Sequence, residues 1–189
     1  MKKVIISTLL VVMSLSLAAC GSKENKTSKV NSSTQVEQSQ KGTFAGLKVM
    51  PQFKVKDIDD KEVTNDIFKD KKVTMINIWG TFCGPCVEEM PTLQELYTEY
   101  KSQGFNLVGI VADGDTNEVQ ALQILKKTKT DFVNLIPDEK FKNDFVSKTK
   151  AVPVSVFVNS KGEILETVVG SKSKEEYKKI IKRNLQQIK

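Results

Sequence analysis

The sequence predicts an α/β domain in which a mixed central β-sheet is flanked by helices. From residue 73 onwards, apolar runs typical of strands alternate with segments that have helical periodicity. A hairpin-like pair of strands and then an amphipathic helix close the chain. The length of 189 residues suits one such domain with accessory segments rather than two domains.

The first predicted elements are a short hairpin and a long central strand. Phe53–Ile58 alternates in polarity, and Asp59-Asp60-Lys61 is expected to turn the chain back toward Glu62 and Val63. Val73–Trp79 is a longer apolar run, so it predicts a buried strand. This strand leads directly into a pair of cysteines.

A helix is predicted after the first cysteine, because apolar positions recur there at helical spacing. These positions are Cys86, Met90, Leu93, Tyr97 and Tyr100. Pro91 is expected to kink this helix because it lacks a backbone donor, and Gly104 is expected to end it. Leu107–Val111 then predicts a second buried strand.

The second half of the chain continues the alternation. Asn117–Gln120 resembles a capping box and predicts the start of a helix whose apolar side carries Val119, Leu122 and Leu125. A short strand around 132–136 and a helix around 138–146 are expected next.

The last elements are a hairpin and a helix. Val154–Val158 and Ile164–Val169 are joined by Asn159-Ser160-Lys161-Gly162, which predicts a turn between two strands. Ser173–Glu176 forms a capping box that opens the final helix. The apolar face of that helix is formed by Tyr177, Ile180, Ile181, Leu185 and Ile188.

Composition excludes several classes of function. The chain contains no histidine, which removes Ser-His-Asp triads and most catalytic zinc sites. The formal net charge is +6, but the lysines are spread along the chain and Arg183 is the single arginine. A nucleic-acid-binding protein would gather basic residues on one face, so no nucleic-acid partner is expected. The dispersed lysines fit a solvated surface near anionic lipid.

The N-terminus predicts export and lipidation. Two lysines precede the apolar run Val4–Leu17, which is shorter than the roughly 20 residues that a spanning helix needs. Leu17-Ala18-Ala19-Cys20-Gly21 resembles a bacterial lipobox, so Cys20 is the expected lipidation site and residues 1–19 the signal peptide. The alternative is an uncleaved membrane anchor. Residues 20–43 are polar and predict a flexible tether, with the folded domain spanning 44–189.

The motif that carries chemistry is Cys83-Gly84-Pro85-Cys86, between a strand and a helix. A cysteine at a helix N-terminus is stabilised as thiolate, so Cys83 is the candidate nucleophile and Cys86 the resolving cysteine. Two other interpretations exist. A zinc site would need four ligands, and the mature chain has no histidine and no further internal cysteine, so carboxylates or a dimer would have to complete it. A structural disulfide across two residues would constrain the unfolded chain little.

The run from Trp79 to Pro91 resembles the thioredoxin superfamily, specifically its membrane-anchored TlpA and ResA type. The resemblance covers Met50–Lys189 and includes an N-terminal hairpin and an inserted stretch at about Ala112–Pro137. It implies a thioredoxin-like fold and a redox-active cysteine pair, with no other cofactor and no metal.

The resemblance also implies roles for further residues. Glu89 matches the family's active-site glutamate, which exchanges protons with the cysteines, and Asn77 stands where cytoplasmic thioredoxins have a buried aspartate. Pro153 matches a cis-proline that faces the cysteines and presents the backbone of Val152 to substrate. The implied substrate-binding residues are Trp79, Phe82, Gly84, Pro85, Val152 and Pro153.

The implied activity is thiol–disulfide exchange. A Gly-Pro dipeptide between the cysteines resembles the reducing members of the superfamily, which favours a reductant of disulfides in exported proteins. The expected substrate is either apocytochrome c or an exported methionine sulfoxide reductase, between which the sequence does not choose, and a CcdA-like membrane thiol carrier is the expected electron donor. The protein is expected to be a monomer, lipid-anchored on the outer face of the bacterial cytoplasmic membrane.

Two other functions stay open at this point. The first is disulfide formation by the same cysteine pair. The second, from a different class, is a non-catalytic lipoprotein that binds a peptide or a metal.

Overall fold

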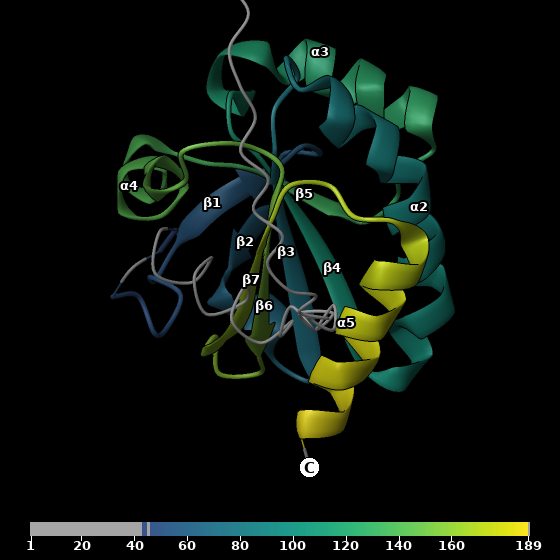
Figure 1. Ribbon diagram of the computed structural model, residues 1–189. Coiled ribbons are helices and arrows are strands. Elements are labelled where there is room, and N and C mark those ends of the chain that lie inside the picture. Colours follow the sequence, from purple (N-terminus) through teal and green to yellow (C-terminus); the bar gives the residue numbers. More distant parts are fainter. Residues whose placement is uncertain (1–42, 45, 189) are drawn as a thin grey trace, which may run out of the picture. The chain divides into compact units, whose positions relative to one another are not determined.

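The computed structural model describes residues 43, 44 and 46–188, so the signal peptide, Cys20 and most of the tether lie outside it. Its centre is a seven-stranded sheet with the order β2-β1-β5-β4-β3-β6-β7 (Figure 1). The strands are β1 (Lys54–Asp57), β2 (Glu62–Thr64), β3 (Val73–Trp79), β4 (Phe105–Val111), β5 (Val133–Ile136), β6 (Val154–Asn159) and β7 (Ile164–Val169). The α-helices of this part are α2 (Gly84–Tyr100), α3 (Gly114–Thr128), α4 (Glu139–Asp144) and α5 (Lys174–Gln187).

The sheet is mixed, as predicted. β3 pairs in parallel with β4, and β4 pairs in parallel with β5. The remaining neighbours are antiparallel, including the β3–β6 pair and the predicted hairpins β1–β2 and β6–β7. β3 therefore lies between a parallel and an antiparallel neighbour, near the middle of the sheet.

The two faces of the sheet carry separate apolar cores, because side chains alternate along each strand. On one face, Ile76 and Ile78 of β3 belong to a cluster with Phe141 and Phe145 from the region of α4. On the other face, Met75 lies with residues of α2 and α5 such as Leu93 and Tyr177. Helices therefore cover both faces (Figure 1).

The helix α3 differs from its prediction. It begins at Gly114, three residues before the predicted start, but Asn117 has non-helical backbone angles (φ −127°, ψ 30°). The capping-box-like segment thus marks an interruption between two helical pieces. Val119 was expected on the apolar side and is 75% exposed, so that prediction is wrong, while Ala121 and Leu125 are buried. The buried positions Ala121 and Leu125 are four residues apart and lie on one face, from which Val119 points away.

The helix that follows the cysteines begins at Gly84 and continues through Pro91 to Tyr100. A short 3-10 turn follows, and Gly104 ends it at φ 91°, a conformation that glycine adopts without strain. The capping box of α5 is confirmed, because the side chains of Ser173 and Glu176 each bond the backbone of the other residue.

Phe44, where the folded domain is predicted to begin, is buried and stacks on Phe145 with ring centroids 4.5 Å apart. Within the described residues, none of the helices combines the length and the apolar character needed to cross a membrane.

Candidate active site

The cysteine pair lies at the connection between the end of β3 and the start of α2. β3 ends at Trp79, and the amide of Cys83 donates to the carbonyl of Gly80 at 3.0 Å, which closes a tight turn. Cys83 is the N-cap of α2, and Pro85 occupies the first turn, where its missing N–H costs nothing. Cys83 and Cys86 are joined in a disulfide. The turn and the helix start together place both sulfurs at the positive end of the helix dipole.

The two cysteines have unequal surroundings. The Cys86 amide donates to Cys83 Sγ at 3.3 Å, so the first cysteine caps its own helix through sulfur. Cys86 is fully buried, whereas Cys83 is 7% exposed. Gly84 and Pro85, which lie between the two cysteines, are exposed. Of the two cysteines, the first is therefore the less completely buried.

A second segment faces the first cysteine across the site. Val152 O lies 3.7 Å from Cys83 Sγ, and the peptide bond between Val152 and Pro153 is cis. The connection between β7 and α5 joins the two segments. Gly170 N donates to Pro153 O at 2.8 Å, and Ser171 Oγ donates to Pro85 O at 3.3 Å.

Glu89 lies one turn after Cys86 on α2 and is only 5% exposed. Its two carboxylate oxygens accept hydrogen bonds from separate elements, Oε1 from Asn77 Nδ2 and Oε2 from the Tyr177 hydroxyl, both at 3.0 Å. Burial raises the pKa of Glu89, and the hydrogen bonds from Asn77 and Tyr177 offset part of that rise. The carboxyl group therefore takes up a proton more readily than an exposed glutamate does.

Trp79 is completely buried, which does not fit the predicted contact with substrate. Its indole Nε1 donates to Asn134 Oδ1 at 2.9 Å, and Asn134 Nδ2 donates to Phe132 O at 2.8 Å. The space for the Asn134 amide exists because residue 109 is glycine: a Cβ there would lie 1.9 Å from Oδ1. Trp79 thus packs beneath the cysteine motif, in one buried cluster with Cys83 and Cys86.

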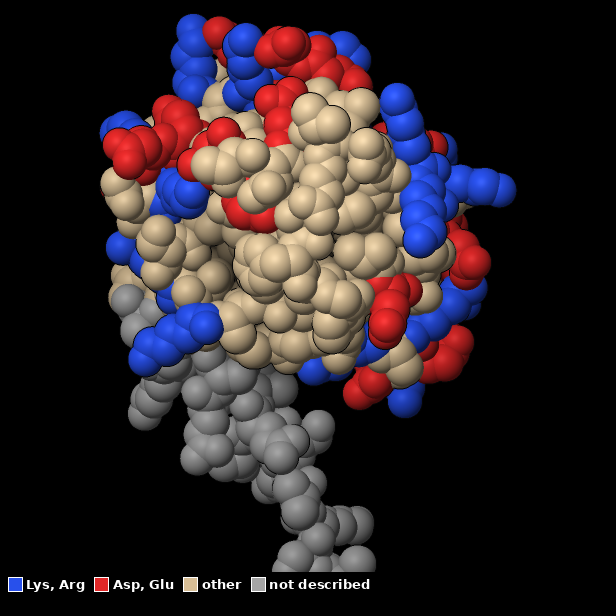
Figure 2. Space-filling view, turned by 90° about the horizontal axis from the view of Figure 1, so that it is seen from above, with Lys and Arg blue, Asp and Glu red and all other residues tan. Residues whose placement is uncertain are grey.

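Phe82 shows the opposite arrangement, because its ring is 71% exposed beside the cysteines. The end of the sheet where β3 leads into α2 lies at the top in Figure 1, and Figure 2 looks down on that end. Basic and acidic side chains stand mostly around the rim of this face, and a continuous patch of uncharged residues lies in its middle (Figure 2). Such a face suits an uncharged, extended stretch of polypeptide.

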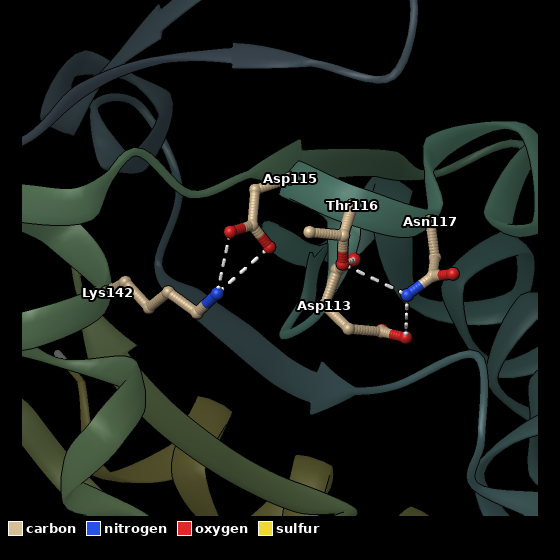
Figure 3. A network of polar contacts seen from close by, with 5 residues as sticks. All are labelled: Asp113, Asp115, Thr116, Asn117 and Lys142. Carbon is tan, nitrogen blue, oxygen red and sulfur yellow. Dashed lines mark hydrogen bonds and ion pairs between the residues drawn. The ribbon is translucent and has the colours of Figure 1, made fainter.

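Sequence reasoning missed Asp113, which follows β4 directly. One carboxylate oxygen accepts from Thr81 N at 3.0 Å, and the other from Thr81 Oγ1 at 2.5 Å and Asn117 Nδ2 at 3.1 Å. Figure 3 shows this carboxylate with Asn117, and a separate ion pair between Asp115 and Lys142 nearby. An available signal was the position of Asp113, since the carboxyl ends of neighbouring parallel strands meet at one edge.

Sequence reasoning also missed the polar role of Tyr177 and Ser155. Tyr177 was placed on the apolar face of the last helix, and it does pack there, but its hydroxyl reaches Glu89. Ser155 stands in an otherwise apolar strand, fully buried, next to the Tyr177 hydroxyl at 3.4 Å. A single serine inside a buried strand was the available signal, because buried hydroxyls need a partner.

Comparisons with known proteins agree with this geometry. The Redoxin family model matches residues 44–182. The chain is 30% identical over 139 residues to the thiol-disulfide oxidoreductase ResA of Bacillus thuringiensis subsp. konkukian, covering 72% of this chain and 76% of that protein. It is 34% identical over 128 residues to the ResA protein of Oceanobacillus iheyensis, covering 64% of this chain and 63% of that one.

Solved structures give the same fold. A putative thioredoxin from Neisseria meningitidis superposes with a TM-score of 0.62 and 30% identity, covering 74% of this chain and 91% of that one. StoA from Bacillus subtilis superposes with a TM-score of 0.57 and 25% identity, covering 70% and 98%. The chain therefore belongs to the Redoxin family and is a TlpA/ResA-like thiol–disulfide oxidoreductase of the thioredoxin superfamily.

Proposed function

We propose that this oxidoreductase works as a reductant, with Cys83 as the attacking cysteine and Cys86 as the resolving cysteine. The observation that carries the roles is the unequal exposure of the two cysteines: Cys83 is 7% exposed, with its sulfur beside Val152 O, and Cys86 is fully buried. The direction is supported by the Gly84-Pro85 dipeptide between the cysteines, which resembles the reducing members of the thioredoxin superfamily.

The proposed reaction begins with the reduced protein. The Cys83 thiolate attacks one sulfur of a substrate disulfide, which forms a mixed disulfide and releases the other substrate sulfur as a thiolate. Cys86 then loses its proton and attacks Cys83 Sγ. The Cys83–Cys86 disulfide forms, the mixed disulfide breaks, and the second substrate thiol departs. Two electrons and two protons pass from the protein to the substrate.

Glu89 is the proposed group that handles the proton of Cys86. The two side chains are three residues apart on α2, which places them on the same side of the helix. Both are buried, so bulk water does not replace the carboxyl as proton acceptor. The raised pKa brings Glu89 closer to the range in which a thiol releases its proton.

Substrate binding is proposed to occur on the uncharged face around the cysteines. The exposed ring of Phe82 and the surfaces of Gly84 and Pro85 line one side, and the backbone of Val152, set by Pro153, lies on the other. An extended substrate segment would pair with that backbone as an added strand. Backbone pairing depends little on the substrate's sequence, which suits a reductant of exported proteins of the apocytochrome c or methionine sulfoxide reductase type.

The experiment that tests the direction is the reduction potential of the Cys83–Cys86 pair in glutathione or dithiothreitol buffers. We expect a value at or below about −250 mV, the range of thioredoxin-like reductants. A value above about −150 mV would make the protein a disulfide donor, and disulfide formation would replace reduction as its function.

The proposed location is the outer face of the cytoplasmic membrane, with the lipid on Cys20 as anchor and a CcdA-like membrane thiol carrier as electron donor. The support is the lipobox-like sequence at Leu17–Gly21. Two acyl chains anchor a protein stably where one chain is marginal.

Cys20→Ala is expected to move the protein from the membrane fraction to the soluble fraction, measured by fractionation and immunoblotting. A mutant that stays with the membrane would contradict lipid anchoring.

A further inference from the structure

Glu89 is one of four buried polar side chains that are joined in a ring of hydrogen bonds, each side chain coming from a different element. The others are Asn77 of β3, Ser155 of β6 and Tyr177 of α5, and none of the three is more than 1% exposed. Asn77 Nδ2 donates to Glu89 Oε1 at 3.0 Å and to Ser155 Oγ at 3.3 Å. The Tyr177 hydroxyl lies 3.0 Å from Glu89 Oε2 and 3.4 Å from Ser155 Oγ.

Counting hydrogens fixes the direction of each bond when Glu89 is ionised. Asn77 uses both of its amide hydrogens, one on Glu89 and one on Ser155. An ionised carboxylate only accepts, so the Tyr177 hydroxyl donates to Glu89 Oε2. The oxygen of Tyr177 is then left as an acceptor, and the Ser155 hydroxyl donates to it.

Protonation of Glu89 on Oε2 reverses the direction of the hydrogen bonds from Ser155 to Tyr177 and from Tyr177 to Glu89. The carboxylic acid now donates to the Tyr177 oxygen, the tyrosine hydrogen turns toward Ser155 Oγ, and the Ser155 hydrogen turns away from Tyr177. Both states keep the contact between Glu89 and Tyr177, and only hydroxyl hydrogens move. Phenylalanine at position 177 would provide neither bond.

We propose that Tyr177 is a positioning residue of the thiol–disulfide reaction, whose hydroxyl reverses its hydrogen bond each time Glu89 takes up or releases a proton. This inference rests on the proposed role of Glu89. In the resolving step the Cys86 thiol gives its proton to Glu89, and Cys86 attacks Cys83 Sγ as the mixed disulfide breaks. Glu89 then gives the proton to the departing substrate thiolate, and Tyr177 returns to donating.

The groups around Glu89 leave Tyr177 as its main adjustable partner. Cys86 precedes it by one turn on α2, and Ser171 and Lys172 approach from the connection between β7 and α5. The charged Nζ of Lys172 is held by Val169 O at 2.8 Å, so this lysine acts on Glu89 through its backbone. The Tyr177 hydrogen bond lowers the pKa of Glu89, against the larger effect of burial.

The test compares Tyr177→Phe with Tyr100→Phe, which makes the same change at another buried tyrosine, eleven residues beyond Glu89 on α2. Infrared difference spectroscopy follows the C=O stretch of protonated Glu89 during a pH titration, and Glu89→Gln identifies the band by its loss. The pH dependence of mixed-disulfide resolution is measured on the same proteins. We expect Tyr177→Phe to move both midpoints up by about one pH unit: the variant loses a bond in both states, and the charge-assisted bond to the ionised carboxylate is the stronger of the two.

The outcomes separate this inference from the role proposed for Glu89. An unchanged infrared midpoint in Tyr177→Phe, or an equal shift in Tyr100→Phe, would overturn the inference. A pH–rate profile that stays the same in Glu89→Gln would overturn the role of Glu89. Ser155→Ala is a second variant that keeps the tyrosine ring in place; it should shift the infrared midpoint less than Tyr177→Phe, because the bond from Tyr177 to Glu89 remains. A shift as large as that of Tyr177→Phe would also count against the inference.

Discussion

Replacing Cys86 with serine is expected to trap the protein as mixed disulfides with its substrates through Cys83. Cys83 stays reactive at the N-terminus of α2, and the partner that would release the substrate is gone. We expect covalent complexes to become the major form after incubation with a disulfide-bonded protein, separated on non-reducing gels and assigned by mass spectrometry. Wild-type protein should show almost none, because Cys86 resolves them.

The matched control is Cys83→Ser, which leaves only the buried sulfur. Cys86 is fully buried, so a substrate disulfide cannot reach it, and we expect no trapping. Equal trapping by the two variants would contradict the assignment of attacking and resolving cysteines. It would also mean that the surface near α2 opens enough to expose Cys86.

Gly109→Ala is expected to destabilise the domain by about 3 kcal/mol, although alanine is among the smallest of changes. The added Cβ would lie 1.9 Å from Asn134 Oδ1 and 3.2 Å from Trp79 Nε1. The asparagine must move, which breaks its buried hydrogen bond with the indole of Trp79. The free energy of unfolding of the oxidised protein, from urea denaturation, measures the loss.

Gly84→Ala provides the control for this prediction. An added Cβ at Gly84 meets nothing within 4 Å, and the residue opens α2, where alanine is a better helix former. Its unfolding free energy should therefore stay within about 0.5 kcal/mol of wild type. If Gly109→Ala changed the unfolding free energy equally little, Asn134 would have another position available, and the stability of the domain would not depend on its hydrogen bond with Trp79.

Much of the fold could be predicted from the sequence, because the patterns that indicate its strands, turns and helix ends involve residues close together in the chain. β3, the hairpin of β6 and β7, and the capping box of α5 lie where alternation, turn residues and side-chain spacing predicted them. The helix α3 was less well predicted, because the side chain of its N-cap residue, Asp113, makes no capping bond and binds Thr81 beside the cysteines instead.

The sequence by itself determined the chemistry of this protein: two cysteines at the junction of a strand and a helix, with a glutamate one turn further along. The tertiary structure decided what surrounds these groups. The partners of Glu89 stand 12 and 88 residues away in the chain, at Asn77 and Tyr177, and only the packing of α5 against α2 and β3 brings them together. It also decided that Trp79 is buried while Phe82 is exposed. Neighbours along a strand or a tight turn have local signals, whereas the environment of a buried carboxyl is set by elements distant in sequence.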